Sequence, residues 1–348
     1  MNAQEHYMRR CLQLAAEGAG KVSPNPMVGA VLVHGDRIIG EGYHRVYGGP
    51  HAEVNCLESV KPEDHGLIAE SVLYVSLEPC AHFGKTPPCT GLILKHKIPE
   101  VVIGTRDPFP EVNGKGIEKL KAAGVKVTAG VLQEECRLQN KRFFVFHTQQ
   151  RPYIILKWAS SFNGKIAGPD GARVLISNEY TNHVVHKWRS HEDAVMVGSR
   201  TAAMDDPLLT TRFWKGRNPV RIVVGSALRL PSGIKLLDGT EKTIVFNTEK
   251  EAEEGKVLFY RVSQAEPVIG QVMRALHRLN IQSVLVEGGR ALLQSFIAEH
   301  AWDEARLITN TGMIIEEGIS APVLQGALLE KKETYLNDTI HYFVSRQQ

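Results

Sequence analysis

Short apolar runs alternate along the chain with amphipathic stretches, and Gly, Pro, Asn or Asp residues separate them. Apolar runs bounded in this way are typical of buried strands, while apolar residues three and four positions apart indicate helices. In the first half of the chain we expect strands at 27–33, 38–43, 72–76, 101–104 and 125–129. The same reasoning predicts helices at 4–17, 51–58, 90–97, 116–123 and 133–146. Gly35-Asp36 suits the turn of a hairpin between the first two strands.

The second half repeats this alternation after a short polar segment that ends in Pro. Strands are expected at 153–159, 194–198, 220–225, 243–246, 283–286, 305–308 and 339–344, and helices at 180–190, 267–279 and 290–300. A chain of 348 residues is long for one domain. Residues 147–152 are therefore the predicted linker between an N-terminal domain, 1–146, and a C-terminal domain, 153–348. Strands that alternate with helices predict a layered α/β domain, with the later strands parallel.

Composition narrows the function classes. The net charge is only +3 and no block of like charges appears, so neither nucleic acid nor a membrane is an expected partner. The polar N-terminus shows no signal peptide or membrane span. Of the five cysteines, Cys11, Cys56 and Cys136 lie in helix-like patterns. Buried, unpaired thiols fit a reducing compartment, so we expect a cytoplasmic protein that acts on small molecules.

Residues 50–89 carry the strongest chemical signal. His51, Cys80 and Cys89 are three good zinc ligands, and three protein ligands leave the fourth tetrahedral position for a catalytic water. Zinc lowers the pKa of such a water to roughly 7. Glu53 could take a proton from that water and deliver it to a leaving amine. Because Pro50 suits a first helical position, we expect His51 in the first turn of its helix.

The spacing of the two cysteines points to one kind of zinc enzyme. H-A-E followed by P-C is the pattern of zinc nucleobase deaminases, but the second Cys follows the first by nine positions. The stretch P-C-A-H-F-G-K-T-P-P-C resembles the pyrimidine deaminase half of the bifunctional riboflavin-biosynthesis deaminase–reductases. This resemblance implies a cytidine-deaminase-like α/β/α domain with one zinc ion. It also implies pyrimidine or phosphate contacts from Asn25, His44 and Lys85, with Asp107 and Asn113 as weaker candidates.

The C-terminal domain resembles the other half of the same enzymes. Residues 160–167, S-S-F-N-G-K-I-A, are similar to the opening of dihydrofolate-reductase-like domains, with Asn163 in place of the usual Asp. Residues 198–212 follow the pattern G-x-x-T-x-x-x-D-D/N-P-x-L-x-x-R of the reductase half. Glu287-Gly288-Gly289, between a predicted strand and a predicted helix, would form a cradle for phosphate.

The resemblance also implies NADPH as hydride donor and assigns site residues by position. Those that would hold the nicotinamide nucleotide are Ala159, Thr201, Asp205, Gly289, Arg290, Ala291, Leu292, Leu293, Gln294 and Ser295. Those that would hold the ribosyl phosphate substrate are Arg173, Arg189, Leu209, Arg212 and Glu287. Where the family commonly reads W-I-T, this chain reads Leu175-Ile176-Ser177. No proton donor for the reduction can be named from the sequence.

We interpret the chain as a bifunctional enzyme of riboflavin biosynthesis. It would deaminate 2,5-diamino-6-ribosylamino-4(3H)-pyrimidinone 5′-phosphate at zinc and then reduce the ribosyl group to ribityl with NADPH. The family resemblance also implies a homo-oligomer formed through the reductase domain. One alternative is a zinc deaminase of another nucleotide or of tRNA, with a C-terminal domain that only binds. The missing basic patch and the long Cys loop speak against it.

Two further alternatives concern activity. The chain could keep zinc for structure alone, although a structural site would not need Glu53. Alternatively, only one half could be active, and the departures at Asn163 and Leu175 point to the reductase as the inactive half.

Overall fold

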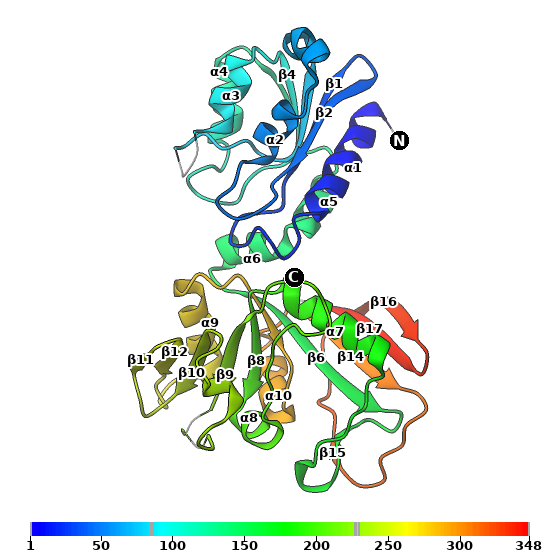
Figure 1. Ribbon diagram of the computed structural model, residues 1–348, viewed down its shortest axis with the longest axis vertical. Coiled ribbons are helices and arrows are strands. Elements are labelled where there is room, and N and C mark those ends of the chain that lie inside the picture. Colours follow the sequence, from blue (N-terminus) through cyan, green and yellow to red (C-terminus); the bar gives the residue numbers. More distant parts are fainter. Residues whose placement is uncertain (1, 84–86, 226–227, 229, 347–348) are drawn as a thin grey trace. The chain divides into compact units, whose positions relative to one another are not determined.

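The computed structural model describes residues 2–83, 87–225, 228 and 230–346. The chain divides into two compact units, Met1–Gln150 and Arg151–Gln348, and each is described by itself (Figure 1). Within the described part of the chain, no helix combines the length and the apolar character that crossing a membrane requires.

The first unit is built on one mixed sheet with the strand order β2-β1-β3-β4-β5. Its strands are β1 (Gly29–His34), β2 (Arg37–Tyr43), β3 (Val72–Leu77), β4 (Glu100–Thr105) and β5 (Lys126–Ala129). The strands β1 and β2 form the predicted antiparallel hairpin, whose turn places Gly35 at a φ of 59°. The later strands β3, β4 and β5 are parallel, as the sequence predicts.

Helices cover both faces of this sheet and give the three layers that were expected (Figure 1). One face carries α1 (Ala3–Ala16) and α5 (Gln133–Gln139), and the other carries α2 (Ala52–Glu58), α3 (Cys89–Lys95) and α4 (Lys115–Ala122). A 3₁₀ helix, η1 (Pro62–Glu70), was not predicted. The thiols of Cys11, Cys56 and Cys136 are buried and unpaired, as expected.

The predicted helix over 133–146 is wrong, because the chain breaks it at Asn140. The structure has α5 (Gln133–Gln139) followed by α6 (Lys141–Gln149). The Asn140 amide donates to the Met27 carbonyl oxygen and accepts from the Met27 N–H, both at 2.8 Å. This two-way pairing with a distant loop holds Asn140 outside helical geometry. Residues 147–149 of the predicted linker also belong to α6 rather than to an irregular segment.

The second unit contains a long sheet with the order β11-β12-β10-β9-β8-β13-β6-β14-β17-β16. Its first eight strands in chain order are β6 (Tyr153–Ser161), β8 (Ala194–Gly198), β9 (Val220–Val224), β10 (Thr243–Asn247), β11 (Ala252–Glu254), β12 (Val257–Arg261), β13 (Ser283–Val286) and β14 (Glu304–Asn310). The last two are β16 (Ala327–Tyr335) and β17 (Asp338–Ser345). A small separate sheet pairs β7 (Lys165–Ala167) with β15 (Ile319–Ser320). The strands β11 and β16 escaped prediction because their patterns are short or largely polar. The apolar strand β12 was missed as well.

Helices flank the long sheet on both faces (Figure 1). The apolar sides of α9 (Val268–Arg278) and α10 (Arg290–Ala298) form the main core with the central strands. On the other face lies α7 (Glu179–His191), whose Trp188 contacts Tyr342 of β17. The strands β8, β13 and β6 are parallel neighbours, so the loops that follow them meet at one edge of the sheet. Ligands of such sheets bind at the carboxyl ends of the strands.

Candidate active sites

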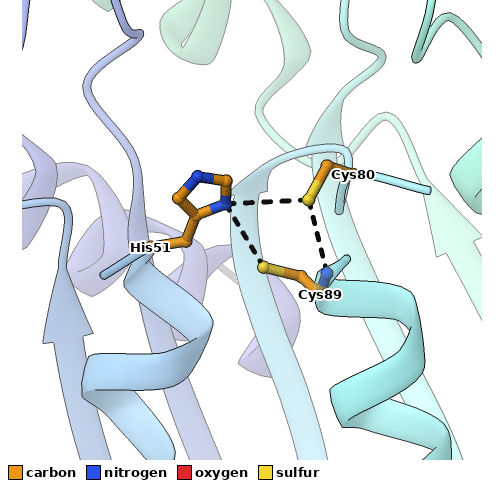
Figure 2. Close-up of side chains that lie close together, drawn as sticks. All are labelled: His51, Cys80 and Cys89. Atoms are coloured by element: carbon orange, nitrogen blue, oxygen red, sulfur yellow. Dashed lines mark hydrogen bonds between the residues drawn. The ribbon is translucent and has the colours of Figure 1, made fainter. Parts of the chain in front are cut away.

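Three predicted zinc ligands converge in the first unit (Figure 2). The His51 Nδ1 atom lies 3.6 Å from the Cys80 sulfur and 3.4 Å from the Cys89 sulfur. Cys80 follows β3, and Cys89 is the first residue of α3. His51 caps α2 with extended backbone instead of lying in its first turn, so that part of the prediction is wrong. This position directs its ring away from the helix and toward the cysteines.

These donors fit zinc. One imidazole nitrogen and two sulfurs are donors that zinc favours, and tetrahedral coordination puts such donors about 3.5 Å apart. All three ligand atoms lie within 4.8 Å of one another. A hydrogen bond from Cys89, together with others from His51 and the Cys89 N–H, lowers the pKa of Cys80 to about 4. The same hydrogen bond and burial raise the pKa of Cys89, so Cys80 is the thiol of this pair that more readily forms the thiolate that binds metal.

Glu53 lies in the first turn of α2, next to this cluster, and is only 3% exposed. Burial raises the pKa of its carboxyl group, and the nearby His51 opposes that shift. A carboxyl group with a raised pKa exchanges protons more easily at neutral pH than an exposed one. Glu53 is therefore suited to proton transfer beside the metal site.

Asn25 and His44 form a pair at the edge of the same site. The Asn25 Nδ2 atom lies 3.0 Å from His44 Nε2, and His44 Nδ1 lies 2.9 Å from the Pro50 carbonyl oxygen. The His44 ring is also 5.6 Å from that of His51 between centroids. Asn25 and His44 therefore lie close to the metal ligands. Lys85, also predicted to bind the substrate, lies outside the described residues.

A buried carboxylate fastens the loop after β4 to the Cys80 segment. Glu78 accepts hydrogen bonds from the backbone N–H groups of Asp107, Gly114, Gly116 and Ile117, at 2.9 to 3.3 Å. A Cβ atom on Gly116 would overlap the Pro79 carbonyl oxygen, so only glycine fits this approach. The loop that carries Asp107 is thus held against the residues that precede Cys80. Asn113, the other weaker candidate in this loop, is exposed.

In the second unit, Arg189 and Glu287 form a buried ion pair at the edge of the long sheet. The Arg189 guanidinium binds both carboxylate oxygens of Glu287, at 2.6 and 2.8 Å. Lys157 of β6 adds a second cation, 3.8 Å from the Glu287 carboxylate. Burial opposes ionisation, but Arg189 and Lys157 lower the pKa of Glu287 to about 2. Arg189 and Glu287, both predicted substrate contacts, are therefore paired with each other at the edge of the sheet.

The segment 209–213 brings two more predicted substrate residues to this ion pair. Leu209 is buried at a φ of 53°, and Arg212 follows it in an exposed loop. Burial and the charges of Arg189 and Arg173 lower the pKa of Arg212. Arg189 also donates to the Thr210 carbonyl oxygen at 3.2 Å, which ties this segment to the ion pair. Clustered arginines are suited to binding a phosphate.

The residues of the predicted phosphate cradle lie where β8 and β13 end. The Gly198 N–H donates to the Gly288 carbonyl oxygen at 2.9 Å, which joins the starts of α8 (Ser199–Asp205) and α10. Gly288 has a φ of 131°, and a Cβ atom on Gly289 would lie 2.7 Å from the Thr201 hydroxyl. Only glycines leave this backbone open to a ligand, and the N-termini of helices favour phosphate. The arrangement fits a dinucleotide.

The other predicted cofactor residues differ in what they offer. Ala159 lies near the carboxyl end of β6, and Asp205 ends α8, where burial raises the pKa of its carboxyl group. Arg290 and Ala291 begin α10, where first-turn N–H groups lack helical partners. Leu292 and Leu293 point into the core and could offer only backbone. The side chains of the remaining two bond within the chain, Gln294 to Val323 and Ser295 to Ala291.

The two departures from the family pattern have different structural settings. Asn163 pairs with Ile315 in both directions: its Nδ2 donates to the carbonyl oxygen at 2.8 Å, and its Oδ1 accepts from the N–H at 3.2 Å. The amide therefore ties the loop after β6 to the segment before β15. Leu175 is 76% exposed and makes no comparable tie, and Arg173 nearby is also exposed.

Comparison with known proteins decides the family. Residues 152–314 match the model of the RibD C-terminal domain, and residues 1–105 match the cytidine and deoxycytidylate deaminase zinc-binding region. The riboflavin biosynthesis protein RibD of Aquifex aeolicus is 40% identical over 321 residues, which cover 91% of this chain and 89% of that protein. The chain belongs to the RibD family.

Solved structures agree with this RibD assignment over nearly the whole chain. The crystal structure of a diaminohydroxyphosphoribosylaminopyrimidine deaminase/5-amino-6-(5-phosphoribosylamino)uracil reductase from Thermotoga maritima is 36% identical. It matches with a TM-score of 0.89 over 99% of both chains. Acinetobacter baumannii RibD, 28% identical, gives a TM-score of 0.88 over 98% of both chains.

RibD membership confirms the predicted architecture and activities. The chain is a bifunctional deaminase and reductase of riboflavin biosynthesis, with a cytidine-deaminase-like domain followed by a dihydrofolate-reductase-like domain. A C-terminal domain that only binds is therefore not favoured.

Sequence reasoning missed two residues of these RibD sites, Glu78 and Lys157. Each interrupts or ends an apolar strand with a charge, and a charge in such a run is rare unless it is paired. That signal could have drawn attention to both residues.

Proposed function

We propose that the first unit hydrolytically deaminates 2,5-diamino-6-ribosylamino-4(3H)-pyrimidinone 5′-phosphate, and that the second reduces the ribosyl group of the product to ribityl with NADPH. The observation that carries the proposal is the convergence of His51, Cys80 and Cys89 beside the buried Glu53. The names of the RibD relatives supply the substrate class.

In the deaminase, each residue has a role that follows from its position. His51, Cys80 and Cys89 would hold zinc, which when bound would activate a water for attack on the amine-bearing carbon. Glu53 accepts the proton of the attacking water and returns it to the departing amine, so that ammonia leaves. Asn25 and His44 orient the pyrimidine edge, because their amide and imidazole groups lie at the border of the metal site.

In the reductase, the chain supplies orientation and charge. NADPH, when bound, would supply the hydride. The glycine cradle and Thr201 would hold its phosphates and ribose, with Ala159 and Asp205 at the nicotinamide end. Arg189, Arg212 and Glu287 would bind the ribosyl phosphate. Lys157 is a buried ammonium group beside Glu287, and burial lowers the pKa of Lys157. It is therefore placed to deliver a proton to the opening sugar.

A coupled assay on the purified chain tests this proposal. The diaminopyrimidinone ribosyl phosphate is supplied with NADPH, and ammonia release and NADPH oxidation are followed together. Both signals are expected, with ammonia release first. Ammonia without oxidation would mean that only the deaminase half works, and neither signal from a zinc-loaded chain would refute the proposed substrate.

We also propose that the chain assembles as a homo-oligomer through its reductase domain and works in the cytoplasm. Family resemblance supports the first statement, and three buried unpaired thiols support the second. Light scattering of the full chain should give a mass that is a multiple of 38.6 kDa. A monomeric mass at assay concentration would refute the assembly.

A further inference from the structure

His186 lies on α7, one turn before Arg189, and the proposed mechanism assigns it no role. Its side chain is 4% exposed. The ring packs edge-on against Phe213, with the centroids 4.7 Å apart. It therefore lies directly under the loop that carries Arg212.

The imidazole accepts hydrogen bonds from that loop. The His186 Nδ1 atom lies 2.9 Å from the Arg212 backbone nitrogen and 3.4 Å from that of Phe213. Backbone N–H groups only donate, so Nδ1 carries no proton and the neutral ring holds its hydrogen on Nε2. His186 thus presents a fixed acceptor where the chain turns into the exposed loop.

The surroundings keep this acceptor neutral. Burial and the positive charges of Arg189 and Arg212 lower the pKa of His186 to about 4. Protonation would remove the acceptor and add another cation beside two arginines. At neutral pH the ring therefore stays in the one state that can hold the loop.

Other contacts hold the two ends of this loop. Arg189 Nη1 donates to the Thr210 carbonyl oxygen at 3.2 Å, which is a second tie to α7. Within the loop, Arg212 donates to the Thr210 hydroxyl, and Thr211 bonds to Arg217 and Asn218. Further along, the Lys187 ammonium of α7 lies 5.1 Å from the centre of the Trp214 ring, Arg217 pairs with Asp193, and Asn218 donates to Glu241. Residues 212–214 are exposed, and His186 accepts from the backbone N–H groups of Arg212 and Phe213 between these contacts. Losing the two bonds to His186 would therefore shift Arg212 while the ends of the loop stay attached.

We propose that His186 is a positioning residue of the reductase. By accepting the Arg212 and Phe213 N–H groups, it holds the Arg212 guanidinium near Arg189, where the two cations together bind the phosphate of the ribosyl substrate. The inference rests on the proposed substrate role of Arg212.

Steady-state kinetics on the full, zinc-loaded chain test this role, with 5-amino-6-(5-phosphoribosylamino)uracil as the substrate. His186→Leu should raise the KM for this substrate roughly tenfold, the loss expected when a hydrogen bond that positions a charged group is removed. The KM for NADPH and the rate of ammonia release should not change. His186→Gln, whose amide oxygen can still accept, should recover part of the lost affinity.

The matched control is His183→Leu. His183 lies on the same helix and also contacts the Phe213 ring, at 5.7 Å between centroids. Its Nδ1, however, pairs with the Glu179 carbonyl oxygen of its own helix, so the variant should keep the KM of the unmodified chain. If His183→Leu raised the KM as much as His186→Leu, ring packing would explain the effect and the inference would be overturned.

Arg212→Ala separates this inference from the proposed function. A raised KM in Arg212→Ala with an unchanged KM in His186→Leu would overturn the inference alone. An unchanged KM in Arg212→Ala would refute the proposed substrate site and the inference with it. If His186→Leu fails to fold, His186→Gln decides: partial loss of substrate affinity with the NADPH KM intact supports the role, and equal loss for both ligands refutes it.

Discussion

At the scale of single residues, the two sites differ in how they use a buried carboxyl group. Burial raises the pKa of Glu53, whereas the cations around Glu287 lower the pKa of that residue to about 2. Glu53 is therefore suited to exchange protons near neutral pH, whereas Glu287 stays ionised. The environment, more than the residue type, decides between them.

Glu53→Gln should retain zinc but lose deamination. The amide keeps the size of the side chain but cannot carry a proton from water to the leaving amine, so ammonia release should fall by about 10² to 10⁴. Metal content and initial rates measure the two effects. Glu58→Gln, an exposed position at the other end of the same helix, is the control and should behave like the unmodified chain.

Glu287→Gln should destabilise the reductase domain at neutral pH. A carboxyl group whose pKa is lower in the folded chain stabilises the fold at every pH above its pKa in the unfolded chain. For Glu287 this stabilisation is lost as the pH falls from 4.5 to about 2. The full contribution is on the order of 3 kcal/mol. Calorimetry should therefore show a Tm difference between the variant and the unmodified chain at pH 7 that shrinks as the pH approaches 3. A pH-independent difference would contradict this.

At the scale of elements, the sequence predicted the regular parts of the structure and missed the places where side chains override local pattern. The hairpin of β1 and β2 and the parallel strands followed from apolar runs and turn residues. The break at Asn140 did not, because its cause is a contact with Met27, more than a hundred positions earlier in the chain. Lys157 was missed for a similar reason, since its partner Glu287 directly follows another strand, β13.

The loop after β4 affects the metal site through Glu78. Gly116→Ala should weaken zinc binding roughly tenfold, because the added Cβ pushes against the Pro79 carbonyl beside Cys80. Chelator competition measures the affinity. Gly66→Ala, at a position where a Cβ meets nothing within 4 Å, is the control. Equal zinc affinity in the two variants would show that the loop does not influence the metal ligands.

At the scale of the whole molecule, the residues of each site lie within one of the two compact units. The zinc ligands fall within the first unit, and the predicted nucleotide and phosphate contacts fall within the second. The family motifs allowed this division to be predicted from sequence. The hydrogen-bonded support of each site could not be predicted, because it joins residues that no local motif contains.

Removing zinc should abolish the deaminase activity and leave the reductase activity unchanged. After treatment with a chelator, ammonia release should be lost, whereas NADPH oxidation with 5-amino-6-(5-phosphoribosylamino)uracil should continue at the original rate. Zinc added back should restore deamination. Loss of both activities on chelation would mean that the reductase also depends on the metal.

The pairing of Asn163 with Ile315 bears on how this chain can be redesigned. A consensus drawn from related domains would favour Asp at this position, yet a carboxylate cannot donate to the Ile315 carbonyl oxygen as the amide does. In Asn163→Asp alone, a carboxylate oxygen would face the Ile315 carbonyl oxygen, and neither atom can donate a hydrogen bond. The residue at 163 and the path of the chain near 315 have therefore become a matched pair, and a graft from a relative should carry both segments.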